Sequence, residues 1–242
     1  MSKHEHDHEH KHTNEHAQPI MLRSESTAVN ISIVGIPTAQ GVLVNYVTDT
    51  SNQPKTFANH IYVWQTTSNA VPWNKTPDGD TALASDSSTG TQQVQFDFED
   101  KGYIIGYAVA PTPKAVCATI FIPQGQTQNP AAWQYDRVTE KVVAVATNLI
   151  QSQYHTLTLY TPASNKNWVG VFLGAQAGYY APIVKKQMIL TDAADGFVVI
   201  EGVRLLIGTT YTVGYFMVDE SSTNGRTSLA ASSTFTVGQV NV

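Results

Sequence analysis

The sequence has little charge, one cysteine and no long hydrophobic run. Charged residues make up 14% of the 242 residues, against roughly 25% in a typical soluble domain. The formal net charge is −5 and Lys and Arg do not cluster, which argues against a nucleic-acid partner. No stretch approaches the roughly 20 apolar residues that a spanning helix needs. We therefore expect no membrane span.

The single cysteine, Cys117, excludes an intrachain disulfide. It lies in the apolar run Val-Cys-Ala-Thr-Ile-Phe at 116–121, where a buried and unreactive thiol is expected. The N-terminus lacks the apolar segment of a signal peptide. The sequence therefore predicts a protein that is cytoplasmic or exported by a non-classical route.

No segment shows apolar residues repeating with the 3.6-residue period of a helix. The chain consists instead of short strand-like runs. In Val-Gln-Phe-Asp-Phe at 94–98, apolar and polar residues alternate as on a half-buried strand. Strands are expected at 29–34, 42–47, 60–65, 92–98, 103–110, 116–122, 141–146, 156–160, 168–173, 186–190, 197–201, 211–218 and 229–237.

Three patterns occur twice in the same order, roughly 110 residues apart. Tyr-Ile-Ile-Gly-Tyr at 103–107 matches Tyr-Thr-Val-Gly-Tyr at 211–215. An aromatic and aliphatic run precedes each of these, and a run of small residues that ends in Phe follows each. The pattern predicts two copies of one domain.

The expected fold class is all-β, with two tandem antiparallel β-sandwich domains joined by a short linker. Residues 1–26 read as a disordered, polar, His-rich tail, 27–122 as the first domain, 123–139 as the linker and 140–242 as the second domain. Trp133 and Tyr135 in the linker are large enough to dock between the domains.

Trp168 on a middle strand and Tyr211 at the start of a later strand resemble residues of immunoglobulin-like and fibronectin type III-like domains. Those folds often place a buried tryptophan and a corner tyrosine at comparable positions. The resemblance covers residues 28–238 and implies an architecture rather than an activity. The Cys-Trp-Cys spacing of antibody domains is missing.

The tail contains most of the histidines, and their alternation with acidic residues suits Zn, Ni or Cu binding. The interpretation is either an engineered affinity tag or a native metal-binding or assembly tail. Two formal matches to the metalloprotease pattern His-Glu-x-x-His, at 4–8 and 8–12, are rejected because the motif requires a helix. The metal-ligating candidates are His4, His6, His8, His10, His12 and His16.

His60 and His155 are the other imidazoles, and no acid-rich or Ser-containing motif surrounds either of them in the sequence. We expect both to be surface or strand-edge residues. No P-loop, nucleophile elbow or dinucleotide fingerprint is found. The sequence therefore offers no required cofactor and no catalytic residue.

Aromatic residues recur in the loop after the third strand of each copy, beside Pro and Asn or Gly. Aromatic rings on loops can stack on a sugar, or they can cover the end of a sandwich or pack between domains. The candidate carbohydrate-binding residues are Trp73, Asn74, Asp78, Tyr179 and Tyr180.

The leading hypothesis is a non-enzymatic protein that acts by surface binding or self-assembly, with a homo-oligomer as the expected partner state. The alternative is a lectin-like, carbohydrate-binding protein with a glycan partner. A membrane-active toxin is a weaker hypothesis, because no amphipathic insertion segment stands out.

Overall fold

The computed structural model describes residues 18–240, which form sixteen β-strands and three short 3₁₀ turns. Within these residues there is no helix long and apolar enough to cross a membrane. The 3₁₀ turns are Pro113–Ala115, Pro130–Ala132 and Gly225–Thr227. The first eight strands are β1 (Gln18–Ala28), β2 (Asn30–Thr38), β3 (Gly41–Val47), β4 (His60–Gln65), β5 (Gly79–Ala82), β6 (Thr89–Val94), β7 (Tyr103–Ala108) and β8 (Val116–Ile122). The second eight are β9 (Gln134–Arg137), β10 (Thr139–Ala146), β11 (Leu149–His155), β12 (Trp168–Leu173), β13 (Ile183–Met188), β14 (Asp195–Glu201), β15 (Thr210–Phe216) and β16 (Leu229–Val240).

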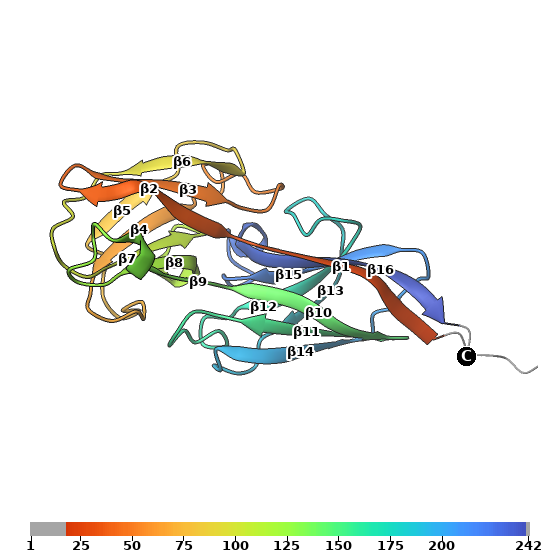
Figure 1. The fold of residues 1–242 in the computed structure, drawn as a ribbon. Helices are drawn as coiled ribbons and strands as arrows, with labels where there is room; N and C mark the ends of the chain where they lie inside the picture. Colours follow the sequence, from red (N-terminus) through yellow and green to blue (C-terminus); the bar gives the residue numbers. More distant parts are fainter. Residues whose placement is uncertain (1–17, 241–242) are drawn as a thin grey trace, which may run out of the picture.

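The strands build two sandwiches that lie end to end (Figure 1). In the first sandwich a three-stranded sheet, β2-β3-β6, packs on a five-stranded sheet, β5-β4-β7-β8-β9. In the second, β10-β11-β14 packs on β1-β16-β15-β12-β13. Every pairing is antiparallel. The predicted fold class of two tandem antiparallel β-sandwiches is confirmed.

The two copies exchange their leading strands. β1 precedes the first copy in the chain, yet it pairs with β16 of the second sandwich over its whole length. β9 precedes the second copy and pairs with β8 of the first sandwich. In Figure 1, β1 runs as a long ribbon from beside β2 into the second lobe, next to β16. Each exchanged strand covers an edge that would otherwise expose unpaired backbone groups.

The exchange corrects two expectations from the sequence. Residues 18–26 were assigned to the tail, but they lie in β1, and residues 134–137 of the expected linker form β9. Neither segment has an apolar pattern that suggests a strand. Each is held instead by backbone pairing with a strand that is distant in the sequence. The histidines of the predicted metal-binding tail lie outside the described residues, so metal binding there stays a prediction.

Equivalent residues build the same buried polar centre in both sandwiches. In the first, the side-chain oxygen of Asn59 accepts a hydrogen bond from the Tyr107 hydroxyl at 2.8 Å. In the second, Asn167 accepts from the Tyr215 hydroxyl at 2.9 Å. Both asparagines are fully buried, so these bonds satisfy groups that water cannot reach. The duplication seen in the sequence is therefore also visible in the cores.

The two residues behind the fibronectin-like resemblance differ in their placement. The Tyr211 hydroxyl accepts a hydrogen bond from the backbone of Leu206 at 3.2 Å, as a corner tyrosine does. Trp168 is buried, but it packs outside the main core. It stacks on Phe216 with ring centroids 4.1 Å apart, whereas its neighbour Val169 points into the core between the sheets. Trp168 is thus a cover for the outer face of the sheet rather than the centre of the core.

Candidate functional site

Trp73, the central residue of the predicted sugar site, lies between the two sandwiches. Its ring packs on Tyr160 of the second sandwich with centroids 4.8 Å apart. Its indole N–H donates to the backbone oxygen of Thr158 at 3.1 Å. The indole N–H is therefore already used in the contact between the sandwiches. This agrees with the alternative that the aromatic loops pack between the domains.

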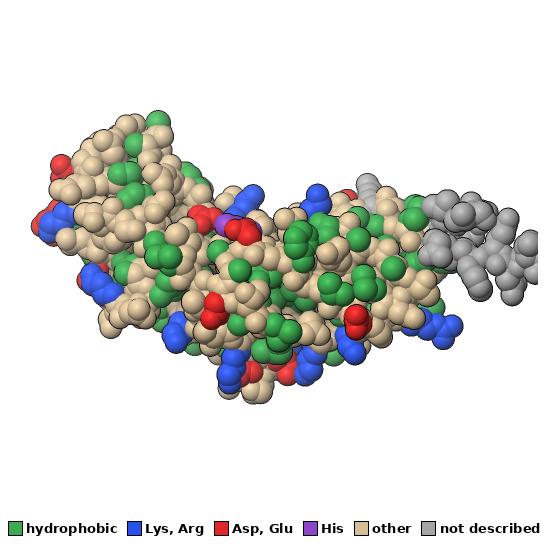
Figure 2. Space-filling model, turned by 90° about the horizontal axis from the view of Figure 1, so that it is seen from below, with side chains coloured by type: hydrophobic (Ala, Val, Ile, Leu, Met, Phe, Trp, Pro, Cys, Tyr) green, Lys and Arg blue, Asp and Glu red, His purple; other side chains and the backbone are tan. Residues whose placement is uncertain are grey.

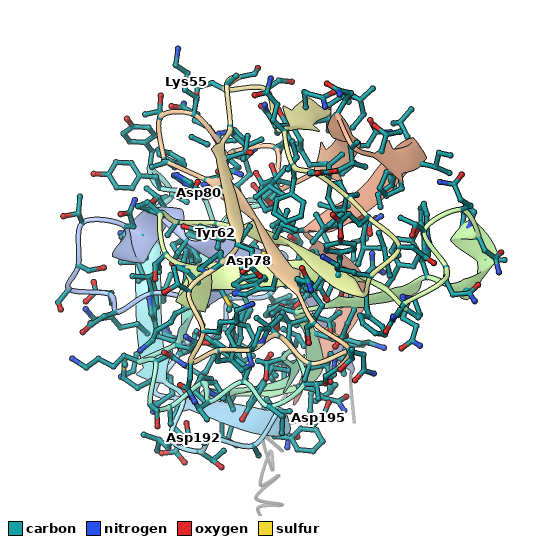
Figure 3. The ribbon with its side chains drawn as sticks, turned by 90° about the vertical axis from the view of Figure 1, so that its left-hand side faces the viewer. Lys55, Tyr62, Asp78, Asp80, Asp192 and Asp195 are labelled. Atoms are coloured by element: carbon teal, nitrogen blue, oxygen red, sulfur yellow. The ribbon has the colours of Figure 1, made fainter. Side chains whose placement is uncertain are left out.

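Asn74 and Asp78 follow Trp73 in the same loop but differ in their roles. Asn74 is exposed and shares a surface hollow of about 530 Å³ with Trp73. Asp78 does not line that hollow. Its carboxylate accepts hydrogen bonds from the Gln65 backbone and from the Lys75 ammonium, both at 2.8 Å. Burial alone would raise the pKa of Asp78, but these bonds and the Lys75 charge lower it. Asp78 thus fixes the hairpin between β4 and β5, where Figure 3 shows it near Asp80.

Tyr179 and Tyr180 lie in the equivalent loop of the second sandwich and do not join Trp73. Tyr179 packs against Phe57 of the first sandwich with centroids 6.0 Å apart. Tyr180 is 85% exposed and meets Tyr179 edge-on at 4.8 Å. Arg226 holds the loop through hydrogen bonds to the backbone oxygens of residues 179 and 181, at 3.1 and 3.0 Å. The two aromatic loops thus make two separate contacts between the sandwiches.

His155 has acidic neighbours that the sequence does not reveal. Its Nδ1 lies 2.7 Å from Asp195 and its Nε2 lies 3.0 Å from Asp136. Burial lowers the pKa of His155, but the hydrogen bonds and charges of the two carboxylates outweigh this and raise it. Since Asp136 is on β9 and His155 on β11, the ion pair links the two sandwiches. His155 is the last residue of β11 and is partly exposed, as expected of a surface or strand-edge residue. Its two acidic partners lie far from it in the sequence.

A cleft of about 520 Å³ opens beside His155, where the chain passes from β9 to β10. Strands β2, β8 and β9 of the first sandwich form one part of its wall, and β10 and β11 of the second form the other. Figure 2 shows a histidine flanked by acidic side chains near the junction of the two lobes. Tyr135 lines this cleft and is 55% exposed, so it does not dock between the domains as expected. Trp133 is buried instead, and its indole N–H donates to Gln126 at 2.8 Å.

Glu140 is a carboxylate buried in the core of the second sandwich. Ser152 donates to one of its oxygens, and Ser233 donates to the other at 2.7 Å. Burial raises the pKa of Glu140 to about 8, although the two hydroxyls lower it in part. The sequence analysis missed Glu140, because the expected strand began at residue 141; the alternation of Val138, Glu140 and Val142 is the signal that could have placed it inward.

The open side of the second sandwich, between β13 and β14, exposes large apolar side chains. A groove of about 230 Å³ runs between these strands. Phe197 is 59% exposed and Val199 43% exposed on β14. Figure 2 shows hydrophobic side chains gathered over this lobe. The groove is also lined by Met188 and Leu190, which are exposed as well. Apolar side chains gathered at a sheet edge are typical of a contact surface.

No protein-family model matches the sequence, and no curated protein matches it either. Among solved structures, the chain is similar to a two-domain fibronectin type III segment of chicken tenascin. The identity is 8%, 88% of this chain and 98% of that chain are covered, and the TM-score is 0.24. It is also similar to Salmonella alpha-2-macroglobulin reacted with methylamine, at 9% identity, over 87% of this chain and 16% of that one, with a TM-score of 0.25. A likeness this weak adds nothing to the fold that the strand pairing shows.

Proposed function

We propose that this chain is a non-enzymatic interaction protein that self-associates through β14, the edge strand of its second sandwich. The observation that carries the proposal is the pair Phe197 and Val199, which are apolar and exposed on that edge. Within residues 18–240, no strand pairs with the outer edge of β14. Unpaired backbone groups beside exposed apolar side chains are a template for strand addition.

The first sandwich protects the equivalent edge strand, β6. By the sheet register, Thr91 and Gln93 occupy the places of Phe197 and Val199. The Thr91 hydroxyl donates to Asn45 on the neighbouring strand at 2.5 Å. Gln92 accepts a hydrogen bond from the Ala84 backbone at 3.1 Å and so closes the open side. The same fold thus has one polar, closed edge and one apolar, open edge.

β14 is a better candidate for pairing than β13, the other open edge of the second sandwich. β13 carries Lys185 and Lys186 at its centre, and lysines on an edge strand oppose the addition of another strand. β14 carries its only charges at its two ends, Asp195 and Glu201. Its centre is therefore free of charge repulsion.

The sequence of β14 is self-complementary. In an antiparallel pair of two β14 strands centred on Val198, Phe197 of each copy lies opposite Val199 of the other. Aromatic and β-branched residues form favourable cross-strand pairs. The three-stranded sheets of the two copies would then join into one continuous sheet. Because a single strand edge buries less area than a standard interface, we expect a weak dimer with a Kd in the micromolar range.

The ends of this register predict how the dimer responds to salt. Asp195 of one copy lies opposite Glu201 of the other, so like charges meet at both ends. Salt screens such repulsion between exposed charges. Association should therefore strengthen as the NaCl concentration rises from about 20 mM to about 500 mM, in contrast to a dimer held by opposite charges.

Sedimentation velocity over a range of protein concentrations tests the proposal. EDTA is included so that metal bound to the His-rich N-terminus cannot bridge copies. The Phe197→Thr/Val199→Gln variant places the residues of the first sandwich on β14 and should abolish the dimer. As a matched control, Leu43→Thr/Val47→Gln removes two similarly exposed apolar residues from the first sandwich and should leave association unchanged. A wild-type chain that stays monomeric, or a dimer that persists in the β14 variant, would refute the proposal.

Three groups with reactive side chains support the non-enzymatic part of the proposal. Both ring nitrogens of His155 are engaged by carboxylates, so neither is free to accept a proton from a substrate. Cys117 is fully buried, and burial raises the pKa of its thiol, which disfavours the nucleophilic thiolate. Glu140 is buried as well and is out of reach of a substrate.

A further inference from the structure

We infer that the cleft between the two sandwiches is a binding site for a neutral saccharide, with Tyr135 as the stacking platform. The cleft has a volume of about 520 Å³, which lies in the usual range for small-ligand sites. It is separate from the β14 edge on which self-association is proposed. The inference therefore does not depend on that proposal.

Tyr135 presents an apolar surface that a sugar ring can cover. Its side chain is 55% exposed and projects from β9, the short edge strand of the first sandwich. Within the described residues, no other aromatic ring packs against it. The phenol ring offers a flat face, and its hydroxyl is available as a hydrogen-bond partner. Trp73, by comparison, has its ring and its N–H occupied by the second sandwich.

The polar side chains of the cleft have unused hydrogen-bonding capacity. In the described part of the chain, the side chains of Asn30, Ser32 and Thr139 make no hydrogen bond. The Thr119 hydroxyl and the Arg137 guanidinium are equally free of partners there. These groups combine donors and acceptors from four strands around one opening. A ligand rich in hydroxyl groups matches this supply of donors and acceptors.

The charges around the cleft favour a neutral ligand. Asp136 and Asp195 share the imidazolium of His155 between them, and Arg137 contributes a second positive charge. The four groups thus sum to about zero when His155 is protonated. Neither a strongly acidic nor a strongly basic ligand would find a net countercharge at this place.

The equivalent position in the second sandwich, beside β1, lacks the features of the cleft. By the register, β1 carries Ser26, Thr27 and Ala28 where β9 carries Tyr135, Asp136 and Arg137. The Thr27 and Ser232 hydroxyls hydrogen-bond each other at 3.0 Å. The hollow beside Thr27 and Ala28 is too small to admit a water molecule. Of these two equivalent places, the one at the junction of the sandwiches is therefore the one with an aromatic ring, an unpaired guanidinium and open volume.

A glycan array of neutral glucans, chitooligosaccharides and galactosides, with sialylated and sulfated glycans as the acidic arm, tests the inference on the full chain. Neutral glycans should bind, and saturation-transfer-difference NMR with the best neutral trisaccharide should show close contacts of its C–H groups. Tyr135→Ala and Arg137→Ala should each weaken that affinity about tenfold or more. Tyr135 is exposed, so its replacement should leave the thermal unfolding temperature unchanged.

Tyr180→Ala is the matched control, because it removes an equally large tyrosine from the exposed loop of the second sandwich. It should leave saccharide affinity unchanged. The inference is overturned if no neutral glycan binds, if only acidic glycans bind, or if binding is lost with Tyr180→Ala and retained with Tyr135→Ala. The last outcome would place the sugar site on the aromatic loops instead.

Discussion

The two sandwiches share their strand order and their buried Asn–Tyr pairs, yet their centres differ in chemistry. The first core contains Ile31, Val44 and Ile120, all buried. The second core holds Glu140, Ser152 and Ser233 at the positions that the register makes equivalent. A buried polar set on an otherwise equivalent scaffold costs stability unless every group is paired. Because Glu140 can titrate and its counterpart Ile31 cannot, we expect this part of the second sandwich to make stability depend on pH.

The largest expected effect is the response of the second sandwich to pH. The pKa of Glu140 is raised by burial from 4.5 to about 8, so the folded state retains a proton that the unfolded chain releases. The contribution of Glu140 to the free energy of unfolding should be largest below pH 4.5 and fall by about 1.4 kcal/mol per pH unit up to about pH 8. Urea unfolding followed by tryptophan fluorescence between pH 4.5 and 8.5 measures this slope.

Glu140→Gln should remove most of that slope, because the amide does not titrate. A second variant, Glu140→Leu with Ser152→Ala, replaces the carboxyl and one of its hydroxyl partners with apolar side chains of similar volume and keeps Ser233, which accepts from the Val142 backbone. Replacing a buried polar set with apolar side chains of similar size is often neutral or stabilising, so this double variant should be at least as stable as the wild type at pH 8. An unchanged pH slope in Glu140→Gln would show that another group is responsible.

The next largest effect is the loss of stability on replacing a buried asparagine, which should differ between the two sandwiches. Asn167 donates to the Met217 backbone at 2.8 Å and to the Tyr160 hydroxyl at 3.0 Å, and it also accepts from Tyr215. The amide nitrogen of Asn59 reaches only Phe57, at 3.5 Å. Asn59 also accepts from the Asn52 amide at 2.8 Å, so the two asparagines differ mainly in the bonds that their amide nitrogens donate. Asn167→Ala should therefore lower the free energy of unfolding by about 4 kcal/mol and Asn59→Ala by about 3 kcal/mol, since two short donated bonds are lost in the first case and one long bond in the second. Equal losses in urea unfolding would contradict this ranking.

The smallest expected effect is that of the ion pair between the sandwiches. The pKa of His155 is raised, because the hydrogen bonds and charges of Asp136 and Asp195 outweigh burial, which would lower it. The pair therefore stabilises the fold fully below about pH 6.5 and loses its effect as pH rises through the folded pKa. Because His155 and Asp136 are partly exposed to solvent, Asp136→Asn should cost only about 0.5 to 1 kcal/mol at pH 5.5.

The measurement for His155 is best made in the Glu140→Gln background, which removes the larger pH effect. Val47 occupies the place of His155 in the first sandwich and has no charge. Urea unfolding at pH 5.5 and 9 should show the Asp136→Asn loss only at the lower pH. A loss of equal size at both values would mean that Asp136 acts through packing rather than charge.

The sequence predicted the duplication and most of the strands, because both depend on local patterns. It missed β5 and β11, and the strand expected at 156–160 is a loop that follows β11. Tyr-x-x-Gly-Tyr occurs at the same place in each copy, and β-branched runs between turn residues identify strands without reference to their partners. β1 could not be identified in this way. Thr27, for example, bonds Ser232 across 205 positions of sequence, and no local period records such a pairing.

The candidate site was predicted less well, for a related reason. Trp73 and Tyr179 were correctly singled out as loop aromatics, but only their neighbours Tyr160 and Phe57 show that each contacts the opposite sandwich. Tyr135 was noticed, but an exposed position could not be read from its surroundings in the sequence. Sugar binding by Trp73, Asn74, Asp78, Tyr179 and Tyr180 stays a prediction.

By itself, the sequence determined that this chain folds as two all-β copies, since alternation, β-branched residues and turn residues act over a few positions. Only the tertiary structure decided which strand completes which sandwich. The same holds for the groups around His155 and for Glu140, whose paired hydroxyls come from strands far apart in the chain. Backbone pairing and burial are set by neighbours in space, and a strand edge can accept any partner of suitable length and direction.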